Sequence, residues 1–356
     1  MLYVSVKGLK KGMLLARNMY DEKLDIAFKE GLKLKNDHID RISKMGYPGA
    51  YILDACANDV TPEPIIPEEM YVGLVKAARG YLLKARDDKD MKVMVSEEEH
   101  REVVMPVIEA LKSRQKLIVE TIDIKPFAGY DYFHATQVML LSLLVGIKLN
   151  LEDRQLYDLA ISSLLHDVGN AFLPEDILNR PGVLTDEEFA MVKQHVQKGV
   201  DYMKNSYNLS PTACLGALQH HENYDGTGYP DNLKRKKISL FGRIIAIADV
   251  YDALVSKRAF RAAMYPYQAL EVVEQRADRK FDPDIVALLG SVLAPYPTGV
   301  LVDLKSGERC IVSRNHYNDI KRPRLTLYDG RRPRYEYIDL HSDPAHAKTR
   351  IIRIVE

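Results

Sequence analysis

The 356-residue sequence contains few cysteines, and they follow none of the spacings found in disulfide scaffolds or zinc sites. Cys56, Cys214 and Cys310 are isolated, with no Cys-x-x-Cys pair among them. Three scattered thiols argue against a secreted protein stabilised by disulfides and favour a reducing compartment. We therefore expect a cytoplasmic protein.

Neither sign of charge is in excess, and no apolar run is long. The 50 Lys and Arg residues balance 50 Asp and Glu residues, so no overall field attracts a nucleic acid polymer or an anionic membrane. The longest apolar run, residues 138–147, is too short to cross a bilayer, and the first residues lack the apolar segment of a signal peptide. We expect neither a membrane nor a nucleic acid polymer as a partner.

The character of the sequence changes along the chain and divides it into four parts. Residues 1–60 mix short β-type runs with one amphipathic stretch, which predicts a small α/β or β module. Residues 61–122 begin with three prolines in nine positions and predict a linker and helical connector. Residues 123–295 have helical periodicity and predict a bundle, whereas residues 296–356 predict a small β module. The expected fold class is mainly α.

Histidines are unusually concentrated in the predicted bundle. It contains five of the ten, namely His134, His166, His195, His220 and His221. The His166-Asp167 pair follows a helical run and precedes Gly169, and by itself it fits either a hydrogen-bonded helix cap or a pair of metal ligands. Neighbouring side chains at a helix end point about 100° apart, so His220 and His221 can flank one cation or bridge two.

Asp249 is a carboxylate on a predicted helix among aliphatic residues. An unpaired buried charge there would cost several kcal/mol or become neutral. A metal ion would remove that cost, and so would a salt bridge to Arg243. The segment alone leaves both alternatives open.

These histidines and aspartates together form a ligand set without a thiolate. Such a set suits iron or manganese first, with nickel and zinc as alternatives. Seven ligands are too many for one ion and suit two ions that share a bridging carboxylate. Because paired cations about 3.5–4 Å apart promote in-line phosphoryl displacement, the set predicts hydrolysis of a phosphoester.

Several stretches between about Phe127 and Pro295 resemble one known family. The sequence resembles the HD-GYP domain proteins of bacterial cyclic di-GMP signalling, which are metal-dependent phosphodiesterases of the HD superfamily. The match covers roughly half of the chain. The matching segments are His134 with Val138, HDVGN (166–170), LPEDILNRPGVLTDEE (173–188), His195 with Gly199, HHENYDGTGYP (220–230) and RIIAIADVYDALVSKRAFR (243–261).

The resemblance implies an HD-type helical bundle that binds two divalent metal ions. One ion would be held by His134, His166, Asp167 and Asp249, and the other by His195, His220 and His221, with Asp167 as the bridging catalytic carboxylate. Some members bind a third ion through a glutamate at the position of Tyr130, so a two-metal site is expected here. The implied reaction is hydrolysis of cyclic di-GMP, through a hydroxide between the metals, to linear pGpG, to GMP or to both.

The resemblance also assigns residues to the substrate. Tyr229 would line the guanine pocket, and Arg258 and Arg261 would hold the phosphates. Asn170 stands at a catalytic position where the family motif ends in lysine. Loss of that charged donor is expected to slow the reaction on the order of 10²-fold, and Arg180 is a nearby cation.

Two alternative functions remain open at this stage. A weakly active or inactive homologue would act as an adaptor that binds cyclic di-GMP or a protein, such as a diguanylate cyclase-type or other signalling partner. An active enzyme could instead hydrolyse another cyclic dinucleotide. Similar short modules precede other HD-GYP domains, so the resemblance implies a regulatory or dimerisation role for residues 1–60. A homodimer is compatible with both alternatives, and we assign no site to the C-terminal module.

Overall fold

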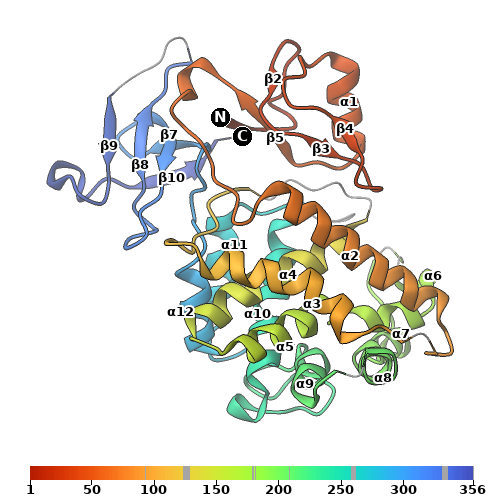
Figure 1. Ribbon diagram of the computed structural model, residues 1–356. Helices are drawn as coiled ribbons and strands as arrows, with labels where there is room; N and C mark the ends of the chain where they lie inside the picture. Colours follow the sequence, from red (N-terminus) through yellow and green to blue (C-terminus); the bar gives the residue numbers. More distant parts are fainter. Residues whose placement is uncertain are drawn as a thin grey trace.

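Two small β-rich modules lie side by side on one end of a helical body (Figure 1). The computed structural model describes residues 1–92, 94–122, 129–178, 180, 182–207, 209–257, 262–330 and 336–355. The predicted fold class is confirmed, because a mainly helical core lies between small N-terminal sheets and a C-terminal antiparallel sheet. The domain boundaries at residues 60, 122 and 295 stay predictions.

The N-terminal module is of the α/β type. Its three-stranded antiparallel sheet has the order β1-β5-β2, and a second pair of strands and one helix cover it. Apolar side chains such as Leu15, Ile42 and Tyr47 are buried between these elements. The elements are β1 (Leu2–Ser5), β2 (Leu14–Leu15), β3 (Met19–Tyr20), β4 (Ile26–Phe28), α1 (Asn36–Lys44) and β5 (Gly49–Leu53).

The helical body has one continuous apolar core. Helices α4 (Tyr130–Lys148), α5 (Asp153–Leu164), α9 (Pro211–Gln219) and α10 (Leu240–Val255) pack at its centre, and α2 (Glu68–Asp87) and α3 (Glu97–Lys112) share the same core. The remaining elements are η2 (Val168–Phe172), α6 (Glu175–Leu178), α7 (Asp186–Val192), α8 (His195–Tyr207), η3 (Arg235–Lys237), α11 (Pro266–Glu274) and α12 (Pro283–Gly290).

The sequence explains the central position of α4. From Val138 to Gly146 every residue is buried, and a helix that is apolar on all sides must be surrounded by other elements. In the described part of the chain, no helix has both the length and the apolar character needed to cross a bilayer.

The C-terminal module contains one five-stranded antiparallel sheet, in the order β10-β6-β7-β8-β9. The N-terminal module packs against it, since Tyr3 and Tyr51 join its apolar cluster and the backbone N–H of Tyr3 donates to the carbonyl of Gly299 at 2.8 Å. The strands are β6 (Leu301–Leu304), β7 (Arg309–Arg314), β8 (Arg324–Leu327), β9 (Tyr337–Asp339) and β10 (Ile351–Ile354).

A close backbone approach between η2 and α8 determines the position of the His166-Asp167 turn. A Cβ atom at Gly169 would lie 1.9 Å from the carbonyl oxygen of His195 and 2.6 Å from the nitrogen of Gly199. Only glycine leaves room for this contact. The packing brings the turn that carries Asp167 against the first residue of α8.

We expect Gly169→Ala to lower the free energy of unfolding by at least about 1–3 kcal/mol, because the added methyl group overlaps backbone atoms that cannot move aside. The matched control is Gly73→Ala in α2, where a Cβ atom would meet nothing within 4 Å. This control is expected to gain about 0.5–1 kcal/mol, since alanine favours a helix interior. Urea denaturation followed by circular dichroism measures both, and equal stability of the two variants would contradict the prediction.

Candidate metal centre

Five short segments of the helical body carry the predicted ligands. His134 lies in the first turns of α4, His166 and Asp167 follow α5, His195 begins α8, and Asp249 lies in α10. The adjacent pair His220 and His221 follows the end of α9. The structure brings all seven side chains into neighbouring positions.

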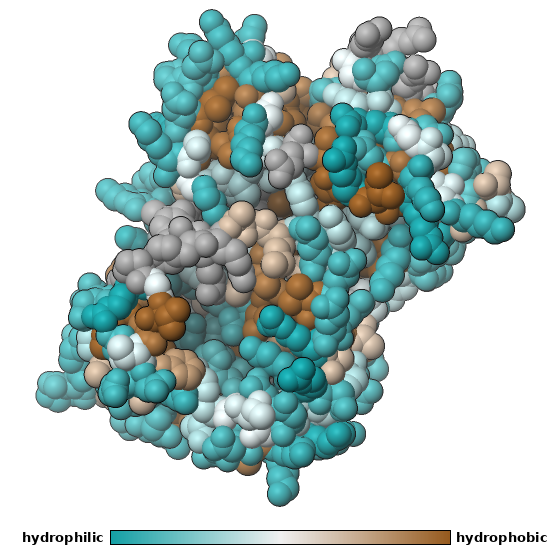
Figure 2. Space-filling view, turned by 180° about the vertical axis from the view of Figure 1, so that it is seen from behind, coloured by the Kyte–Doolittle hydropathy of each residue, from teal (hydrophilic) through white to brown (hydrophobic). Residues whose placement is uncertain are grey.

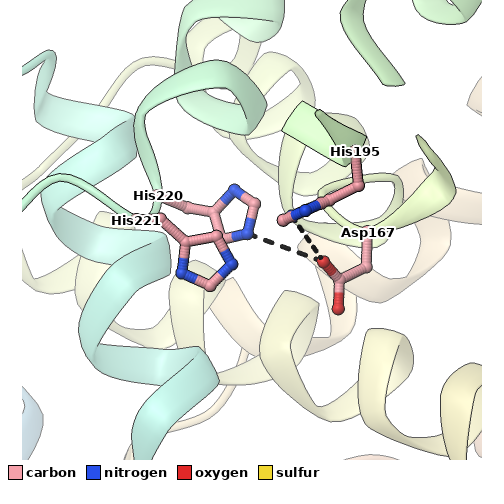
Figure 3. A group of neighbouring side chains, drawn as sticks. All are labelled: Asp167, His195, His220 and His221. Atoms are coloured by element: carbon pink, nitrogen blue, oxygen red, sulfur yellow. Dashed lines mark ion pairs between the residues drawn. The ribbon is translucent and has the colours of Figure 1, made fainter. Parts of the chain in front are cut away.

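One group consists of Asp167, His195, His220 and His221, whose candidate ligand atoms all lie within 4.8 Å of one another (Figure 3). Asp167 Oδ1 lies 3.3 Å from His195 Nε2 and 3.6 Å from His220 Nε2. Figure 3 shows these side chains pointing toward a shared space from different elements.

A second group consists of His134, His166 and Asp167. Here the other carboxylate oxygen, Asp167 Oδ2, lies 3.5 Å from His166 Nε2. Asp249 adjoins this group, because its Oδ1 lies 3.1 Å from His134 Nε2. Asp167 thus belongs to both groups, as a bridging carboxylate would, and the grouping parallels the ligand sets that the resemblance implied. Metal ligation itself stays a prediction.

Three of the imidazole rings are oriented in the same way. The Nδ1 atoms of His166, His195 and His220 lie 2.8, 2.7 and 2.6 Å from the carbonyl oxygens of the residues three positions earlier. These carbonyls lie at or near helix C-termini, where the intrahelical pattern leaves acceptors unused. Because Nδ1 must donate there, the lone pair of each ring is on Nε2 and faces the group.

The Nε2 atoms of these three rings are buried, and among the described residues they have no hydrogen-bond partner. A buried acceptor without a partner costs roughly 1–3 kcal/mol. Three such atoms around one carboxylate are therefore unfavourable unless a cation binds between them. The donor set of neutral imidazole and carboxylate fits a divalent first-row transition metal.

His134 is held differently, between two aspartates. Its Nδ1 lies 2.6 Å from Asp252 Oδ2, and its Nε2 faces Asp249. Burial disfavours a charged ring, but the hydrogen bonds to both carboxylates outweigh burial and raise the pKa of His134 to about 9. Asp252 is a buried residue that the sequence analysis did not assign, although it lies one helical turn after Asp249. It orients His134 in the way that carboxylates orient metal-binding histidines.

The protonation states of His166, His221 and Asp167 suit metal binding, whereas at His134 and His195 hydrogen bonds to carboxylates outweigh burial and raise the pKa. Burial lowers the pKa of His166 to about 4, and burial together with the neighbouring His220 lowers the pKa of His221 well below its usual value. Desolvation alone would raise the pKa of Asp167, but His166, His195 and His220 bring it well below the usual range. Neutral imidazoles and ionised carboxylates are the forms that ligate metals.

Tyr130 and Tyr229 lie next to the histidines. Tyr130 stacks on His134 with the ring centroids 5.1 Å apart and the planes at 15°. The resemblance implied a glutamate at this position in members that bind a third metal, and the residue here is aromatic. Tyr229 stacks on His221 at 4.8 Å and 25°. Lys193, which the sequence analysis did not single out, places its Nζ 5.5 Å from the centre of the Tyr229 ring.

Asn170 and the arginines considered in the sequence analysis lie in different surroundings or outside the described residues. Asn170 lies in η2, and its backbone N–H donates to the carbonyl of Asp167 at 3.0 Å. Arg180 forms an ion pair with Glu188. The salt bridge considered between Asp249 and Arg243 is wrong, because Arg243 pairs with Asp282 at 2.5 Å. Arg258 and Arg261 lie outside the described residues.

Comparison with known proteins places these observations in a family. The model of the HD domain matches residues 112–285. A cyclic di-GMP phosphodiesterase of Pseudomonas aeruginosa is 33% identical over 213 residues, which cover 59% of this chain and 51% of that protein. The cyclic di-GMP phosphodiesterase response regulator RpfG of Xanthomonas campestris pv. campestris is 38% identical over 147 residues, 41% of this chain and 39% of that protein.

A third relative is named for a different substrate. The 3'3'-cGAMP-specific phosphodiesterase 2 of Vibrio cholerae is 41% identical over 129 residues, which cover 36% of this chain and 25% of that protein. The chain thus spans about half, or less, of the length of these relatives. The matched segment contains all seven clustered side chains. The resemblance read from the motifs is confirmed, because residues 112–285 match the HD domain and the relatives are cyclic dinucleotide phosphodiesterases at 33–41% identity.

Proposed function

We propose that this protein is a metal-dependent phosphodiesterase that hydrolyses cyclic di-GMP. The observation that carries the proposal is the position of Asp167, whose two oxygens face two groups of histidines. A single carboxylate between two such groups is suited to join two cations, and two cations are suited to displacement at phosphorus. Relatives at 33–38% identity are named as cyclic di-GMP phosphodiesterases, which supports this substrate.

The proposed metal ligands fall into two sets that share Asp167. His134, His166 and Asp249 complete one set, and His195, His220 and His221 complete the other. Iron and manganese suit this nitrogen and oxygen environment best. The chemistry that a pair of divalent ions supplies when bound is the activation of water and the neutralisation of charge on the phosphate.

The protein contributes orientation and binding. The Nδ1 bonds to backbone carbonyls fix three imidazole rings, and Asp252 fixes a fourth, so the ligand atoms do not reorganise when substrate binds. Tyr229 offers an aromatic face beside His221 for a guanine base. Arg258 and Arg261 are proposed to hold the phosphates through their planar donor groups.

The products proposed are linear pGpG, GMP or both. Hydrolysis of another cyclic dinucleotide is the second candidate, because a relative at 41% identity is named as specific for 3'3'-cGAMP. The test begins with anaerobic reconstitution of the purified protein with Fe²⁺ or Mn²⁺. The protein is then incubated with each dinucleotide separately, and chromatography of the products shows which one is hydrolysed. Binding of cyclic di-GMP without formation of any product would refute the proposed enzymatic activity and favour a role as a cyclic di-GMP-binding adaptor.

Replacement of a single ligand should abolish most activity. We expect His195→Ala to lower the rate of cyclic di-GMP hydrolysis by about two orders of magnitude, because one of the two sets loses a ligand and with it charge stabilisation at the phosphate. The matched control is His38→Ala in α1, in the N-terminal module, which should hydrolyse at the wild-type rate. Metal content and rate are measured on the same preparations, and full activity of His195→Ala would contradict the ligand assignment.

Asn170 is proposed to limit the rate, because an amide replaces the charged lysine of the family motif. We expect Asn170→Lys to raise kcat on the order of 10- to 100-fold, by analogy with the loss of one preorganised donor in other enzymes. Asn170→Gln adds length without charge and should leave kcat near the wild-type value. An equal rate in all three proteins would show that position 170 does not limit turnover.

Metal binding should also stabilise the fold, independently of any substrate. Adding Mn²⁺ at about 100 times its dissociation constant is expected to add about 2.7 kcal/mol to the free energy of unfolding. Differential scanning fluorimetry should then record a higher melting temperature, which EDTA reverses. Asp167→Ala removes the residue common to both groups and should not respond, so a wild-type shift in that variant would contradict a shared carboxylate.

A further inference from the structure

A cavity of about 650 Å³ lies where the N-terminal module meets the helical body. Its walls come from the N-terminal module, from α2, from α4 and from α10. Among the described residues, the clustered metal-ligand candidates do not line it. Figure 2 shows apolar side chains gathered along the junction between the modules and the helical body. The volume falls within the range of about 300–1,000 Å³ that is typical of small-molecule sites.

The lining is mainly apolar and aromatic. Val72 and Val75 of α2 and Leu140 of α4 contribute aliphatic surface, and Tyr20 of β3 and Tyr251 of α10 contribute aromatic rings. A cavity of this size and composition is unfavourable when filled with water alone, because apolar walls offer water few hydrogen bonds. Its composition therefore favours an organic ligand with an apolar body.

Arg17 provides a fixed positive charge in the wall. Its guanidinium lies over the ring of Tyr51, with 4.8 Å from Cζ to the ring centre, and one N–H donates to the carbonyl of Pro62. These two contacts hold a planar group that has five N–H donors in all. The lining carboxylate Glu68 accepts hydrogen bonds from Tyr20 and Asn18, which reduces its competition for Arg17.

We propose that this cavity is a binding site for a small organic acid with an apolar body, whose carboxylate pairs with Arg17. Aliphatic and aromatic wall residues surround the body of such a molecule, and the arginine recognises its carboxylate. The ligand would lie between a module of unassigned role and the helices that carry the metal centre. Binding there would require both parts of the chain.

The cavity also reaches a residue that orients a metal-ligand candidate. Asp252 lines the cavity, and its Oδ2 lies 2.6 Å from Nδ1 of His134. A ligand against Tyr251 and Asp252 would therefore alter how firmly His134 is held, and with it the affinity for metal. This coupling rests on the proposed metal centre, whereas binding of the acid does not.

The absence of tryptophan from the chain permits a direct binding assay. Tyr71→Trp places a single indole in the cavity wall, and we expect decanoate to change its emission in a saturable way. Decanol serves as the uncharged probe of the same length. Absence of saturable binding of decanoate at millimolar concentration would overturn the proposal.

Two substitutions in the same reporter protein locate the binding. Val72→Phe fills the cavity and should abolish the response to decanoate, whereas the control Val183→Phe adds the same ring at an exposed position and should not.

Arg17→Met should weaken decanoate binding on the order of tenfold without affecting decanol, and Arg41→Met in α1 should affect neither probe. Equal loss of both probes in Arg17→Met would overturn pairing with a carboxylate.

Calorimetric titration with Mn²⁺ tests the coupling without an activity assay. Saturating decanoate should change the Mn²⁺ dissociation constant on the order of fivefold, which is typical of coupled sites. In Val72→Phe it should cause no change, which controls for direct association of decanoate with the metal. Saturable decanoate binding with an unchanged Mn²⁺ affinity would overturn the coupling, and failure of Mn²⁺ to bind at all would instead refute the metal centre.

Discussion

A single carboxylate, Asp167, lies between two groups of buried imidazoles, and much of the helical body serves to hold it there. Each of its oxygens faces different histidines, and these histidines come from elements far apart in the sequence. The two groups can share one residue only because the turn after α5 lies against the start of α8. That contact depends on Gly169, where any side chain would overlap the backbone of His195.

Backbone carbonyls at helix ends determine the orientations of three imidazole rings. Helix ends leave carbonyl groups without partners, and a histidine just beyond such an end can donate its Nδ1–H to one of them. His166, His195 and His220 all do so, and each ring then faces the metal groups with its acceptor nitrogen. His134 lies inside a helix, where the carbonyls are already bonded. The carboxylate of Asp252, in α10, orients the His134 ring instead.

Asp252 connects the candidate metal centre with the rest of the molecule. It orients His134 on one side and lines the cavity under the N-terminal module on the other. Helices α4 and α10 therefore each contribute to both sites. The N-terminal module, or a ligand in the cavity, can therefore affect the metal-ligand candidates through α10. A single buried hydrogen bond, from Asp252 to His134, connects the cavity wall with them.

The sequence by itself determined the fold class and the candidate ligand residues. Helical periodicity, adjacent histidines and the 220–230 motif are local features, and local features can be read along the chain. Only the tertiary structure decided that Asp249 pairs with His134, which lies 115 positions away, and not with Arg243 in the same helix. The role of Asp252 and the cavity beside Arg17 were also hidden, because each depends on residues more than a hundred positions apart that meet only when separate elements pack together.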